Sequence, residues 1–142
     1  MKYVDMPKRD IADAATFHLM LFDMGLHNQQ AARLIGVPGP QKDAERTVSR
    51  WREGLHAVPV PVWTIVAEAH ALFEANAQRL IEARRAAGAD APPLVTYRST
   101  NALYDAVPET FGQLPVQYHW ALMLRVSKAT GARVEYAKAA GE

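Results

Sequence analysis

The chain has 142 residues and 49% hydrophobic content, enough for one compact domain or for a small domain with an accessory region. It has no cysteine, which excludes disulfides, thiolate zinc fingers and thiol nucleophiles. Its formal net charge is +1, with eight Lys and Arg against seven Asp and Glu up to Pro61 and eight against eight beyond. A basic surface would therefore have to be a local patch.

The N-terminus lacks the apolar run of a signal peptide, and no run of about 18 apolar residues could span a membrane. We therefore expect a cytoplasmic protein with no membrane partner. Residues 1–9 are predicted to be a loose arm, either a frayed terminus or a carrier of Lys2, Lys8 and Arg9 for a phosphate backbone.

Apolar residues recur at helical spacing from Asp10 onward and predict a first helix over about 10–24, ended by Gly25. The residues that carry this stripe are Ile11, Ala14, Ala15, His18, Leu21 and Phe22. A second helix is expected after Leu26, capped by His27 or Asn28 and ended by Gly36 in a left-handed turn. Its packed side is formed by Ala31, Ala32, Leu34 and Ile35.

Glycine and proline predict a loop over residues 37–43, with a third helix that starts near Asp43 or Ala44 and ends at Gly54. Val48 and Trp51 share one face of that helix and would anchor it to a core. The outer surface would then carry Arg46, Thr47, Ser49, Arg50 and Glu53.

Prolines at 59 and 61 predict a non-helical turn over residues 55–61, followed by a long fourth helix over about 62–87. Residues 88–93 form the clearest linker, and beyond them the hydrophobic period changes. Alternation predicts strands over 94–98 and 133–137, with helices over 101–107 and 116–130 between them. Ser99 or Thr100 would cap the shorter helix.

The helix over 116–130 is apolar nearly all round and must be covered on both sides. A region of about 50 residues with two strands offers little to cover it, and a two-stranded sheet is marginal by itself. We therefore expect a homodimer formed by the C-terminal region. The residues expected at this interface are Tyr97, Tyr118, Trp120, Leu122, Met123, Val126, Val134 and Tyr136.

The pattern Leu26-x4-Ala31-Ala32-x-Leu34-Ile35-Gly36-Val37 resembles the scaffold half of the phage-repressor helix-turn-helix of the Cro and lambda-repressor type. Residues 47–54, TVSRWREG, resemble the recognition helix of that family and its glycine stop. The chain departs from the family in its longer turn and in Arg52, where the family usually has glutamate.

The resemblance implies a recognition helix in the major groove of DNA and side chains that fix its position on the phosphates. The residues expected to read bases are Arg46, Thr47, Ser49 and Arg50. Those expected to contact phosphates are Asn28, Gln29, Gln30, Gln41, Lys42 and Arg52.

The predicted layout is mainly α (α+β). A helix-turn-helix bundle with its long fourth helix fills residues 1–87, and a two-strand, two-helix dimerisation region fills 88–142. This layout is similar to that of certain anti-CRISPR-associated repressors. The resemblance implies a homodimer that binds an inverted-repeat operator and represses a phage or mobile-element operon that includes its own gene. Some such proteins also bind the messenger RNA.

Two alternatives keep the fold and change the partner: an RNA-binding translational regulator, and an antitoxin-like module that docks another protein. Catalysis has little support, because the five histidines lack metal-ligand spacing and there is no phosphate-binding glycine loop or G-x-S-x-G turn. We expect no enzyme activity, no cofactor and no metal.

Overall fold

The structure is a computed structural model that describes residues 3–107 and 114–138. The described residues form six α-helices and a small parallel sheet of two strands, so the prediction of a mainly helical chain is confirmed. The chain divides into two compact units, Met1–Leu72 and Phe73–Glu142. The boundary falls inside the long helix α4 (Val60–Ala87), whereas the sequence had placed it after Ala87.

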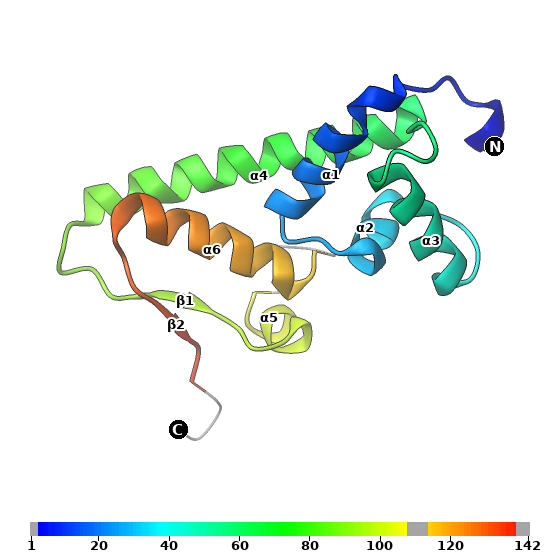
Figure 1. The fold of residues 1–142 in the computed structure, drawn as a ribbon. Coiled ribbons are helices and arrows are strands. Elements are labelled where there is room, and N and C mark those ends of the chain that lie inside the picture. The colour runs from blue at the N-terminus through cyan, green and yellow to red at the C-terminus, as the bar shows by residue number, and fades with distance from the viewer. Residues whose placement is uncertain (1–2, 108–113, 139–142) are drawn as a thin grey trace. The chain divides into compact units, whose positions relative to one another are not determined.

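Unit 1 is built from α1 (Ala14–Asp23), α2 (Asn28–Ile35), α3 (Gln41–Arg52) and the first part of α4. Figure 1 shows α2 and α3 side by side, joined by the loop over residues 36–40. The core of unit 1 contains Phe17 of α1. The Phe17 ring packs edge to face with the Trp51 ring of α3, with 6.3 Å between the ring centroids. Both rings are buried, so Trp51 anchors α3 as its spacing from Val48 predicted.

The predicted apolar stripe of α1 was wrong in part. The buried residues are Ala14, Phe17, Leu21 and, just beyond the helix, Met24, while Phe22 is 68% exposed. The helix also begins at Ala14, after a 3-10 turn over Ile11–Asp13 that Asp10 caps. Apolar residues lie on both sides of α1, so periodicity alone did not identify the packed face.

The turn between α2 and α3 is shorter than predicted. Gly36 ends α2 in the left-handed conformation, with φ +79°, and Pro40 caps α3, which starts at Gln41. A proline fits this position because the N-terminal residues of a helix need no intrahelical acceptor for their N–H groups. Gln41 and Lys42 therefore belong to the first turn of α3 and not to the loop.

The described part of the N-terminal arm, from Tyr3 onward, packs against the rest of unit 1, so the prediction of a loose arm was wrong for it. Lys2 lies outside the described residues. Lys8 forms an antiparallel bridge with Pro59, flanked by hydrogen bonds from the amides of Arg9 and Val60 to the carbonyls of Val58 and Pro7, both 2.8 Å. The Arg9 guanidinium also lies 4.3 Å from the centre of the Trp63 ring.

The long helix begins at Val60, two residues earlier than predicted. Pro61 is its second residue, where its missing N–H breaks no helical hydrogen bond. The expectation that both prolines exclude helix was therefore wrong for Pro61.

Unit 2 consists of the second part of α4 with β1 (Leu94–Thr96), α5 (Thr100–Ala106), α6 (Val116–Thr130) and β2 (Val134–Tyr136). Ser99 caps α5 by accepting a hydrogen bond from the amide of Ala102 at 3.1 Å. β1 and β2 are parallel, with Leu94 opposite Val134 and Thr96 opposite Tyr136. The predicted order of strand, two helices and strand is confirmed, with shorter strands.

Helix α6 is covered on two sides within unit 2. On one side Phe73 of α4 meets Tyr118 edge to face at 5.2 Å between centroids. On the other, the Thr96 hydroxyl lies 2.6 Å from Nδ1 of the buried His119. The second part of α4 covers a side of α6 that we expected a second copy to cover, so the all-round apolar character of α6 does not itself require a dimer.

Candidate nucleic-acid interface

Helix α3 presents one buried face and one charged face. Ala44, Val48 and Trp51 are buried against the rest of unit 1. Lys42, Arg46 and Arg50 follow one another at intervals of four residues, so they share a face. All three are exposed and lie on the side opposite the buried residues. This row of three exposed cations is called here the basic row.

The two hydroxyls expected to read bases lie beside the basic row and are engaged within α3. Thr47 Oγ1 donates to the carbonyl of Asp43 at 3.0 Å, and Ser49 Oγ donates to Glu53 Oε1 at 3.2 Å. A hydroxyl that donates within the helix can still accept a hydrogen bond from outside. The Asp43 and Glu53 carboxylates lower the charge of this face, so its attraction for phosphate is modest.

The start of α2 borders an open groove of about 740 Å³. The groove is lined from α1, α2 and α3 by His18, His27, Asn28, Gln29, Gln30, Glu45, Ser49, Arg52 and Glu53. Of the three residues expected to contact phosphate here, Gln30 accepts a hydrogen bond from the His27 amide at 3.0 Å and thereby caps α2. Gln29 lines the same groove, and Asn28 begins α2 at its border.

Arg52 lines this groove and links three segments of unit 1. Its Nε donates to Nδ1 of His18 on α1 at 2.9 Å, and its Nη1 donates to the Leu26 carbonyl at 2.9 Å and to Asn28 Oδ1 at 3.2 Å. We call these contacts the Arg52 clamp. Sequence reasoning missed it, because a contact between positions 18 and 52 leaves no periodic signal.

The clamp fixes the protonation state of His18. An arginine donates and cannot accept, so Nδ1 of His18 must carry a lone pair. Partial burial lowers the pKa of His18, and the nearby positive charge of Arg52 lowers it further. Burial also lowers the pKa of Arg52, which nevertheless stays charged. The clamp is therefore intact when His18 is neutral.

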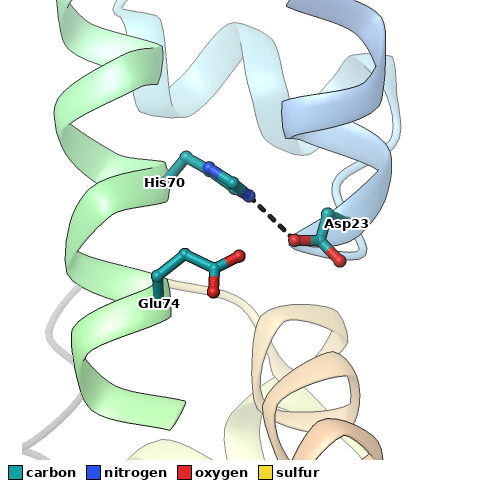
Figure 2. A group of neighbouring side chains, drawn as sticks. All are labelled: Asp23, His70 and Glu74. Atoms are coloured by element: carbon teal, nitrogen blue, oxygen red, sulfur yellow. Dashed lines mark hydrogen bonds and ion pairs between the residues drawn. The ribbon is translucent and has the colours of Figure 1, made fainter. Parts of the chain in front are cut away.

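A second histidine pair joins α1 to α4 within unit 1. Nε2 of His70 lies 2.8 Å from Oδ2 of Asp23, as Figure 2 shows. Glu74, also drawn there, follows His70 by one turn of α4 but belongs to unit 2, where its carboxylate pairs with Arg125 at 2.9 Å. Each carboxylate has a partner in its own unit, and we give both pairs a structural role.

The residues expected at a dimer interface divide into two groups. Tyr118, Leu122, Met123 and Val126 are buried inside unit 2, where they form its core. Trp120, Val134 and Tyr136 instead line an apolar groove of about 360 Å³ between α6 and the strands. Tyr97 lies at the end of β1, and its carbonyl accepts a hydrogen bond from Trp120 Nε1 at 2.7 Å. Apart from Met123, which also lines this groove, only the second group is placed where another molecule could reach it.

No protein family, curated protein or solved structure was found to match this chain. Among the residues that the structure describes, no helix combines the length and the apolar character needed to cross a bilayer.

Proposed function

We propose that the chain is a sequence-specific DNA-binding repressor that inserts α3 into the major groove. The observation that carries the proposal is the basic row of Lys42, Arg46 and Arg50, which faces away from the core of a two-helix scaffold. An arginine can bind guanine through two hydrogen bonds, and such a pair discriminates between bases. Arg46 and Arg50 are proposed to read bases, and Lys42 and Gln41 to contact phosphate.

In this proposal the repressor acts as a homodimer that binds an inverted repeat of DNA. One copy offers three cations on α3 beside two carboxylates, and the whole chain is nearly neutral, so a single copy should bind DNA weakly. Two copies held at a fixed spacing would place their α3 helices in major grooves about 34 Å apart. By analogy with anti-CRISPR-associated repressors, such an operator would control a phage or mobile-element operon that includes the protein's own gene.

The proposal is tested by selecting bound fragments from a random double-stranded DNA library with the full chain. We expect one inverted repeat to be recovered. On that sequence, Arg50→Ala and Arg46→Ala should each weaken binding by about 1–3 kcal/mol and relax the preference at one position of each half-site. Lys42→Ala should weaken binding to all DNA sequences by a similar factor, and the affinity should depend less steeply on salt concentration.

Arg79→Ala is the matched control, since it removes one exposed positive charge from α4 in unit 2. Its operator affinity should equal that of the unchanged chain. Recovery of no preferred sequence, or equal affinities for Arg50→Ala and the control, would rule out the reading role of α3.

One observation favours RNA as an alternative or additional ligand. Phe22 of α1 is 68% exposed, and its ring centroid lies 6.0 Å from that of His18. His18 lines the open groove at the start of α2. Single-stranded RNA bases stack on exposed aromatic rings of this kind. A parallel selection from an RNA hairpin library tests this reading, and Phe22→Ala should reduce RNA binding while leaving DNA binding unchanged.

A further inference from the structure

Among the described residues, the outer edge of β2 in unit 2 pairs with no strand. In the parallel ladder the Leu94 amide donates to the Arg133 carbonyl at 2.9 Å, and the Ala137 amide donates to the Thr96 carbonyl at 2.8 Å. The alternation of a ladder then directs the backbone groups of Val134 and Tyr136 away from β1. Among the described residues the sheet has only these two strands, so that edge of β2 faces no further strand.

An apolar groove lies against the same strand. It has a volume of about 360 Å³ and lies between α6 and the two strands, lined by Thr96, Trp120, Met123, Leu124, Val134, Glu135 and Tyr136. Leu124 is 55% exposed and Tyr136 is 48% exposed. Exposed apolar side chains next to an unpaired strand edge favour pairing with another strand.

The charges on β2 identify the occupant. Arg133 and Glu135 lie two residues apart, on one face of the strand, and form an ion pair with each other. In an antiparallel pairing of β2 with its own copy, centred on Val134, Arg133 lies opposite Glu135 of the second copy, and the reverse. A register shifted by one pair would instead set Glu135 opposite Glu135, and like charges directly opposite destabilise a sheet. The strand is therefore complementary in charge to itself.

We propose that two copies of the chain join by antiparallel pairing of their β2 edges about a two-fold axis at Val134. The result is a four-stranded sheet in the order β1, β2, β2 of the second copy, β1 of the second copy. The groove side chains of the two copies, Trp120, Leu124 and Tyr136, cover one another beside the axis. This inference rests on the dimeric part of the proposed function and specifies its interface.

The first test is sedimentation equilibrium of the full chain at micromolar concentration, where we expect a dimer. Val134→Pro removes a backbone N–H that points away from β1. An edge strand tolerates this loss, but the proposed pairing of two β2 strands needs that N–H as a donor. This variant should yield a folded monomer with an unchanged circular dichroism spectrum. Val134→Thr keeps the N–H and should remain dimeric.

The second test avoids the backbone of β2. Leu124→Lys places a charge in the groove, and Leu72→Lys is its matched control, because the two helical leucines are 55% and 56% exposed. We expect only Leu124→Lys to weaken the dimer. Arg133→Glu should raise the dissociation constant by about tenfold, and adding Glu135→Arg should restore it.

A monomer for the unchanged chain would overturn this inference, as would a dimer that survives both Val134→Pro and Leu124→Lys. The DNA selection and the measurements of oligomeric state distinguish failure of the DNA-binding proposal from failure of this interface. If the variants behave as expected but no DNA sequence is selected, the interface stands and the repressor function does not. If a monomer selects a single half-site, the interface fails and DNA reading stands.

Discussion

Arg52 is the residue whose role changes most between sequence and structure. The resemblance to phage repressors placed it on phosphate, but its Nε and Nη1 atoms already donate to His18, the Leu26 carbonyl and Asn28. A guanidinium held in this way fixes the start of α2 against the end of α3. We therefore propose that Arg52 positions the two helices and does not itself bind the phosphate backbone.

A comparison of Arg52→Ala with Arg52→Lys separates these roles. If Arg52 positions the helices, both variants should lose about 1–3 kcal/mol of stability, because lysine cannot reproduce three directed hydrogen bonds. The slope of DNA affinity against salt should stay unchanged in both. The measurements are thermal unfolding and a salt titration of DNA binding. A slope that falls by about one in the alanine variant alone would instead mark a phosphate contact.

At the scale of elements, periodicity predicted nearly every helix and strand, because most of them bury one face and the chain alternates accordingly; α6, which is covered on two sides, is the exception. Periodicity failed where two apolar faces compete, as in α1, where Phe22 fits the spacing but is exposed. It also failed at prolines, since Pro40 and Pro61 occupy the starts of helices and not their interruptions. Of the candidate site, the exposed positions of α3 were predictable. The Arg52 clamp and the β2 edge were not, because both depend on contacts distant in sequence.

The turn from α2 to α3 depends on Gly36. With φ +79° it adopts a left-handed conformation that side chains disfavour, although no atom lies within 4 Å of the place a Cβ would take. Gly36→Ala should therefore cost about 1–2 kcal/mol through backbone strain alone. Denaturant unfolding measures this cost. Ala15→Gly, at an exposed position of α1, provides a control for ordinary helix propensity and should cost about 1 kcal/mol or less. A neutral Gly36→Ala would show that the turn tolerates another conformation.

At the scale of the whole molecule, the division into two units separates the tasks that we propose. Unit 1 carries the basic row and the Arg52 clamp, and unit 2 carries the β2 edge and its groove. Unit 2 also buries His119 between α6 and β1, where it is 4% exposed and adjoins Thr96. Burial lowers the pKa of His119 from 6.5 to about 4. The charge state of one side chain thus bears on the unit that we propose holds two copies together.

This burial predicts acid sensitivity of unit 2. As the pH falls below about 6.5, His119 becomes protonated in the unfolded chain. In the folded chain it stays neutral until the pH approaches about 4. The contribution of the neutral imidazole to stability is therefore complete above pH 6.5 and is lost progressively between pH 6.5 and 4. The loss should be on the order of 3 kcal/mol, since one pKa unit corresponds to about 1.4 kcal/mol.

Denaturant unfolding at a series of pH values, followed by amide exchange in unit 2, measures this slope. His119→Gln should be less stable at neutral pH and should show a flatter dependence between pH 6.5 and 4. An equal slope in both proteins would assign the acid sensitivity to the carboxylates instead.

The docked N-terminal segment has a practical consequence. Lys8 and Arg9 are exposed side chains, but the backbone between them is held to residues 58–60 by a bridge and two hydrogen bonds. A protease that cuts after basic residues needs an extended backbone in its cleft, so it can cut here only after the segment has detached. The rate of tryptic cleavage at these two positions therefore reports how often unit 1 opens at its N-terminal end, without any label.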